Sequence, residues 1–91
     1  MEKIREHITF AGRVQGVGFR YKATHLARHF SLTGWVRNEY DGTVTGEFQG
    51  LSLEIDMVIQ HLVQDAYICI DQIERKRIPL ELEERGFSVR R

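Results

Sequence analysis

The stretch GRVQGVGFR, residues 12–20, marks the point where the sequence changes from a strand pattern to a helix pattern. Before it, apolar and polar residues alternate from Ile4 to Val14, which predicts a strand with one buried face. Gly16 and Gly18 then interrupt the pattern. Two glycines within three positions indicate a tight loop with positive φ or a close backbone approach.

A helix is expected to follow this loop. From Phe19 onward the apolar residues recur at helical spacing, and polar residues fill the other positions. The helix is predicted to end near Ser31, with Gly34 closing the connection to the next strand. The predicted apolar stripe comprises Phe19, Ala23, Leu26, Ala27 and Phe30.

Two further strands are expected over residues 35–38 and 43–49. Asp41-Gly42 lies between them and is a strong signal for a hairpin turn. These residues therefore predict an antiparallel pair.

The second helix has the cleanest helical periodicity in the chain. Ser52 is expected to cap its N-terminus, and the helix is predicted to end near Asp65. Its predicted stripe comprises Ile55, Val58, Ile59, Leu62, Val63 and Ala66. Residues 68–78 then predict a strand with much solvent exposure, and residues 86–90 predict a short final strand.

The resulting order is β-α-β-β-α-β with a short extra strand, which is the split βαβ, ferredoxin-like pattern. We therefore expect an α+β protein, a ferredoxin-like two-layer α/β sandwich whose antiparallel sheet of four to five strands carries two helices on one face. No linker rich in Pro, Gly or Ser divides the chain, so residues 1–91 are expected to form a single domain. This fold hosts many functions, so function must come from the site.

The composition excludes several classes of protein. Thirteen basic residues balance thirteen acidic ones, which argues against a generic nucleic-acid binder. The single cysteine, Cys69, cannot form an intrachain disulfide. No apolar run approaches the roughly 18 residues of a membrane span, and the N-terminus has no signal-peptide core. A cytoplasmic protein that binds neither nucleic acid nor membrane is expected.

The loop before the first helix is a candidate anion site. Glycines there let successive backbone N–H groups point toward one place at the positive end of a helix, and such a nest binds anions. Arg20 lies where its planar guanidinium could add charge-assisted hydrogen bonds. From the glycine spacing alone, a plain tight turn is an equal alternative.

Asn38 and Glu39 stand at the end of the next predicted strand. That strand end could place Asn38 near the glycine loop, although composition alone favours an ordinary turn residue. Glu39 is expected to point to solvent on the hairpin, with a role as general base as the alternative.

These two stretches together resemble the acylphosphatase family. Every position of residues 12–20 fits its first signature, and residues 34–38 (GWVRN) followed by 41–44 (DGTV) fit its second. The resemblance is close from about His7 to Gly50 and specific, because both signatures occur in the family's order and spacing. The later half resembles the family in element order, and residues 86–90 look like its last strand. Residues 67–71 depart from it, lacking the usual Gly/Pro/Ser-rich connection, which concerns the shape of that loop and not the phosphate cradle and leaves open whether leaving-group preference is altered.

The resemblance implies hydrolysis of the carboxyl-phosphate bond of a small acyl phosphate to a carboxylate and inorganic phosphate. It implies that Arg20 binds the phosphoryl group and that Asn38 holds the attacking water. No metal, cofactor or covalent intermediate is expected, and phosphate is expected to act as a competitive inhibitor of a monomeric enzyme. The phosphate-binding loop would comprise Gln15, Gly16, Val17, Gly18, Phe19 and Arg20.

Two other functions are compatible with the pattern. The first is a non-catalytic anion- or phosphate-binding regulatory module of the same fold, because such chains also resemble N-terminal domains of larger carbamoyl-phosphate-handling maturation proteins. Asn38 distinguishes the enzyme from this module, because a phosphate sensor gains nothing from an amide that orients water. The second is an RNA-binding sheet, suggested by Trp35 and Tyr40, but the basic-aromatic signature of that module is absent.

Overall fold

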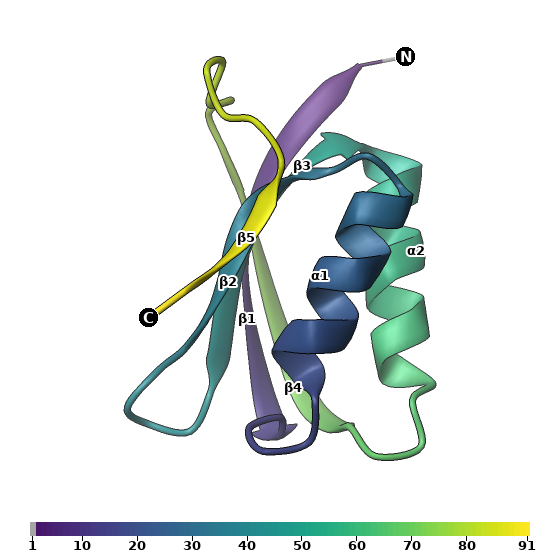
Figure 1. The fold of residues 1–91 in the computed structure, drawn as a ribbon, viewed down its shortest axis with the longest axis vertical. Helices are drawn as coiled ribbons and strands as arrows, with labels where there is room; N and C mark the ends of the chain where they lie inside the picture. The colour runs from purple at the N-terminus through teal and green to yellow at the C-terminus, as the bar shows by residue number, and fades with distance from the viewer. Residues whose placement is uncertain (1) are drawn as a thin grey trace.

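A computed structural model describes residues 2–91 as five strands and two helices (Figure 1). Their order confirms the predicted β-α-β-β-α-β succession with one further strand. The elements are β1 (Lys3–Arg13), α1 (Phe19–His29), β2 (Thr33–Asn38), β3 (Val44–Leu51), α2 (Ser52–Val63), β4 (Cys69–Ile78) and β5 (Phe87–Arg90).

The five strands form one sheet in the order β4-β1-β3-β2-β5. The pairs β1–β4, β1–β3 and β2–β3 are antiparallel, as predicted. The fifth strand differs, because β5 pairs parallel to β2, with Gly34 opposite Phe87. The connection between β4 and β5 crosses to the other edge of the sheet, where the strand it meets runs in the same direction.

Both helices cover one face of the sheet, so the chain forms the expected two-layer, ferredoxin-like sandwich (Figure 1). The core lies between the layers. The predicted stripe of α1 is confirmed, with Leu26 and Phe30 only partly buried. In α2 the stripe is correct through Leu62, but Val63 and Ala66 are exposed, because Val63 ends the helix and Ala66 lies beyond it.

One helix boundary differs from the sequence prediction, and the other agrees closely with it. Ser52 is not the N-cap of α2 but its first residue, because β3 runs directly into the helix through Leu51 in extended conformation. In the described chain this end has no side-chain capping hydrogen bond. The first helix ends at His29, close to the predicted end near Ser31, and Ser31 reverses the chain with a left-handed φ of 59°. Leu32 N–H donates to Ala27 O at 2.8 Å, which forms a Schellman-type end.

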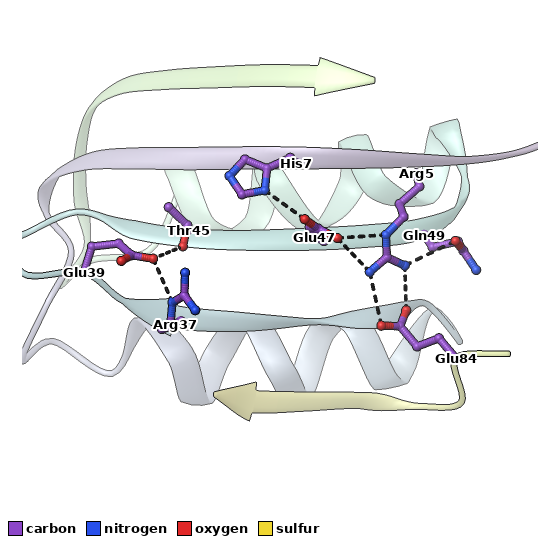
Figure 2. Close-up of polar contacts among 8 residues, drawn as sticks. All are labelled: Arg5, His7, Arg37, Glu39, Thr45, Glu47, Gln49 and Glu84. Atoms are coloured by element: carbon purple, nitrogen blue, oxygen red, sulfur yellow. Dashed lines mark hydrogen bonds and ion pairs between the residues drawn. The ribbon is translucent and has the colours of Figure 1, made fainter. Parts of the chain in front are cut away.

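The face of the sheet opposite the helices carries polar side chains (Figure 2). Arg5 is only 4% exposed there, although it lies on the polar parity of β1. Its guanidinium donates to Glu84 Oε1 at 2.7 Å and to Glu47 Oε1 at 3.0 Å. Because Glu84 belongs to the β4–β5 connection, this ion pair holds that connection against the sheet. Within residues 2–91, neither helix is long and apolar enough to cross a membrane.

Candidate active site

The loop between β1 and α1 is shaped by two glycines with positive φ. Gly16 has a φ of 73° and Gly18, the N-cap of α1, has a φ of 81°. The first turn of the helix closes with Lys22 N–H donating to Gly18 O at 3.0 Å. A methyl group at Gly16 or Gly18 would meet no heavy atom of residues 2–91 within 4 Å. The backbone conformation therefore requires these glycines, and the space before them is open.

That open space is a hollow of about 410 Å³ at the N-terminus of α1. Arg20 and Asn38, the two predicted catalytic residues, both line it, together with Gly16 and Gly18. The structure therefore brings together the two sequence signatures at one place. The rest of the lining comprises Val14, Phe19, Tyr21, Val89 and Arg91.

Two residues of the predicted phosphate-binding loop turn their side chains elsewhere. Val17 packs against the hydrophobic core. Gln15 Nε2 donates to Glu39 O at 2.8 Å and to Thr43 O at 2.9 Å. Gln15 thus ties the glycine loop to the β2–β3 turn, a contact that sequence reasoning missed. Both residues keep their backbone in the loop.

Asn38 is positioned by the hairpin that follows it. It is the last residue of β2 and pairs with Val44 of β3. The turn is closed by Glu39 N–H donating to Thr43 O at 2.9 Å and by Asp41 Oδ1 accepting from Thr43 N–H at 3.0 Å. The predicted Asp-Gly hairpin is therefore confirmed. In Figure 1 this hairpin and the β1–α1 loop lie at the same end of the sheet.

The guanidinium of Arg20 is uncommitted. In the described part of the chain it makes no ion pair or side-chain hydrogen bond, and no acidic residue lies in the first turn of α1. No Asp or Glu of residues 2–91 lines the hollow either. The positive charge of Arg20 therefore adds to the positive end of the helix dipole without local compensation.

Glu39 does not point freely to solvent, which corrects the sequence expectation. It is half-buried on the open face of the sheet, where it accepts hydrogen bonds from Arg37 Nε at 2.9 Å and from the Thr45 hydroxyl (Figure 2). The Thr45 hydroxyl, and after it Arg37, lower the pKa of the Glu39 carboxyl below its ordinary value. Glu39 lines a neighbouring hollow of about 470 Å³, which shares Asn38 with the first.

Three residues of the hollow were not singled out from the sequence. Tyr21 directly follows Arg20 at the start of α1. Its position next to a predicted site residue was the sequence signal that could have identified it. Val89 and Arg91 reach the hollow only because β5 pairs with β2, a long-range contact with no local signal. Across residues 2–91, no group of three His, Cys, Asp or Glu side chains could hold a metal ion.

The fold and the hollow define a class of protein: an α+β sandwich in which a glycine loop, a helix N-terminus and a free arginine meet at one hollow, an arrangement of donors and positive charge that suits an anion. A protein-family model described as Acylphosphatase matches residues 6–89, which is most of the chain. The chain therefore belongs to the acylphosphatase family. This membership confirms the resemblance in the two signatures and the expected enzyme class, a hydrolase of acid anhydrides.

Individual relatives are similar to this protein over nearly the whole length of its chain. An acylphosphatase of Nostoc sp. is 39% identical over 94 residues, which cover 97% of this chain and 87% of that protein. The crystal structure of acylphosphatase from Bacillus subtilis superposes with a TM-score of 0.89 at 27% identity, covering 97% of this chain and 99% of the other. Full-length HypF, in its phosphate- and nucleotide-bound form, also matches (TM-score 0.87, 27% identity), but the match covers only 12% of that chain against 97% of this one.

Proposed function

We propose that the hollow hydrolyses the carboxyl-phosphate bond of small acyl phosphates to a carboxylate and inorganic phosphate. The observation that carries this proposal is the convergence of the free Arg20 and of Asn38 on one hollow at the N-terminus of α1. Family membership supports the same reaction. Residues 1–91 would act as a single unit, a cytoplasmic monomer.

The loop and Arg20 would bind the phosphoryl group. Backbone N–H groups at the start of α1 and the planar guanidinium of Arg20 offer fixed donors to its oxygens. Charge remains on the equatorial oxygens as the carboxylate leaves, and fixed donors stabilise it without reorganising. A carboxylate leaves readily without a strong general acid, so we propose a reaction with no metal, cofactor or covalent intermediate.

Asn38 would orient the attacking water. Its amide is a poor base but both donates and accepts hydrogen bonds, so its contribution is position rather than proton transfer. The loss of such positioning costs about 3–5 kcal/mol, or roughly 10²–10⁴ in rate. A regulatory phosphate-binding module would need the loop and Arg20 but would gain nothing from this amide. Asn38 in the hollow therefore favours the enzyme.

The test is hydrolysis of benzoyl phosphate in the presence of EDTA by the parent, by Asn38→Ala and by Gln60→Ala. Gln60 is an exposed amide on α2, outside the hollow, and controls for the loss of an amide. The proposal expects turnover by the parent and by Gln60→Ala, and a loss of at least two orders of magnitude in kcat for Asn38→Ala. A folded parent that binds phosphate without turnover would instead identify a binding module.

A further inference from the structure

The proposed roles of the loop, Arg20 and Asn38 leave part of the hollow unexplained. Its lining also includes Tyr21 from α1 and Val89 from β5. Both are apolar yet exposed, Tyr21 at 79% and Val89 at 44%. Exposed apolar side chains that line a hollow are typical of a surface that contacts a ligand.

We propose that Tyr21 and Val89 contact the acyl group of the substrate, and that the site favours acyl phosphates with an apolar or aromatic acyl group over acetyl phosphate. This inference rests on the proposed function and adds the class of substrate. The acyl group is bonded to the anchored phosphoryl group through one oxygen, so it must extend from the glycine loop into the rest of the hollow.

The chemistry of the lining supports an apolar acyl group. The hollow is also lined by Val14 and Phe19, which belong to the hydrophobic core. An aromatic acyl group against Tyr21 and Val89 would remove apolar surface of both partners from water, whereas an acetyl group is too small to cover either side chain. The lining therefore separates into a polar part for the phosphoryl group and an apolar part for the acyl group.

The ring of Tyr21 also has a stacking partner on its own helix before any ligand binds. It stacks on the ring of His25, one turn further along α1, with the ring centres 6.3 Å apart and the planes 10° from parallel. A side chain that is already ordered loses less conformational entropy on binding. Tyr67 is equally exposed, at 77%, but lies between α2 and β4, outside both hollows that the described residues form beside Asn38.

The experiment compares kcat/KM for benzoyl phosphate and acetyl phosphate in the parent, Tyr21→Ala, Val89→Ala and Tyr67→Ala. The two substrates differ in intrinsic reactivity, so the informative quantity is how their ratio changes between variants. For Tyr21→Ala, kcat/KM is expected to fall about 5- to 20-fold for benzoyl phosphate and less than about 2-fold for acetyl phosphate. Val89→Ala should change the ratio in the same direction, and Tyr67→Ala should leave it unchanged.

Inhibition by inorganic phosphate provides a second readout, because phosphate has no acyl group. Its inhibition constant is expected to stay within about 2-fold of the parent in Tyr21→Ala and Val89→Ala. Equal losses for both substrates, or no loss for either, would overturn the inference. A higher kcat/KM for succinyl phosphate than for benzoyl phosphate would also overturn it, because it would assign acyl recognition to the charge of Arg91.

A failure of the proposed function would have a different signature. In that case the parent would hydrolyse neither substrate. Binding of the non-hydrolysable benzoylphosphonate and acetylphosphonate, measured by calorimetry, would then decide the inference separately. Tighter binding of benzoylphosphonate that is lost in Tyr21→Ala would support the apolar contact, and equal binding of the two would refute it.

Discussion

The side-chain nitrogen Nε2 of Gln15 lies 2.8 Å from the carbonyl oxygen of Glu39 and donates a hydrogen bond to it. A second bond from the same nitrogen reaches Thr43 O at 2.9 Å. The two carbonyls flank the turn that follows Asn38, so Gln15 fixes the glycine loop relative to the strand end that carries Asn38. The two sequence signatures are therefore connected by a side chain of the first.

Replacing Gln15 with Leu should separate positioning from phosphate binding. The variant removes both hydrogen bonds but leaves Arg20 and the loop glycines in place. We expect kcat to fall about 10- to 100-fold because Asn38 loses its position, while the inhibition constant of phosphate changes less than about 3-fold. The free energy of unfolding, measured in urea, should fall by about 1–3 kcal/mol.

Gln72→Leu, an exposed change on β4, is the control for that variant and should alter neither kcat nor stability by a comparable amount. If kcat and phosphate affinity of Gln15→Leu decline in proportion, Gln15 shapes the phosphate cradle itself rather than the place of Asn38.

Arg20→Lys should not behave as a conservative change. Lysine keeps the positive charge but loses the planar fork that contacts two phosphoryl oxygens at once. Steady-state kinetics should show kcat/KM lower by at least about 10-fold and weaker competitive inhibition by phosphate. Arg13→Lys, at the exposed end of β1 and outside the lining of the hollow, is the matched control. Turnover and phosphate inhibition equal to the parent in Arg20→Lys would refute the proposed cradle.

Glu39→Gln should retain activity. The Glu39 carboxyl has a lowered pKa because the Thr45 hydroxyl, and then Arg37, stabilise its charged form, so it stays ionised throughout the neutral range. A general base works best with a pKa near the working pH. We expect kcat within about 3-fold of the parent and an unchanged pH–rate profile above about pH 5. The disappearance of an acidic limb from that profile would assign Glu39 a role in proton transfer.

The same variant has a consequence for stability. A carboxyl whose pKa is lowered by folding stabilises the folded state above its ordinary pKa, and this stabilisation is lost as the pH falls through the folded-state value. The difference in unfolding free energy between the parent and Glu39→Gln should therefore be largest at neutral pH and should disappear in acid. Urea unfolding at pH 7 and at a series of decreasing pH values measures it.

Ser31→Gly should stabilise the protein. Ser31 has a φ of 59°, which costs a residue with a side chain about 1–2 kcal/mol and costs glycine almost nothing. Part of this gain is offset by the greater entropy of glycine in the unfolded chain, so we expect a net gain of about 0.5–1 kcal/mol, seen as a higher melting temperature. Ser52→Gly, in the right-handed first turn of α2, should lower it instead. A lower melting temperature for Ser31→Gly would contradict the described end of α1.

The parts of the fold that could be predicted depend on contacts close in sequence. The strand–loop–helix change at residues 12–20 and the Asp41-Gly42 turn follow from periodicity and from glycine geometry. Ser52 was predicted wrongly as a cap because a serine before a helical stripe is typical of an N-cap, whereas here β3 continues without a loop into α2.

The parts that could not be predicted depend on contacts distant in sequence. The alternation of β1 predicts that Arg5 faces solvent, yet Glu84, 79 residues away, covers it. The parallel pairing of β5 with β2 depends on how residues 79–86 cross the sheet, which no local pattern encodes. The same holds for the candidate site: Arg20 and Asn38 are predicted from their motifs, while the hydrogen bonds of Gln15 to the β2–β3 turn depend on the hairpin register.

The walls of the hollow come from opposite ends of the chain, from Val14 to Arg91. Ligand binding and folding are therefore linked equilibria. A ligand that contacts β1, α1, β2 and β5 together binds only the folded chain, because no part of the unfolded chain offers all four contacts. A ligand at 100 times its dissociation constant then adds about 2.7 kcal/mol to the stability of the whole domain. An acyl phosphate that contacts all these walls would thus stabilise the folded state, including strands that it never touches.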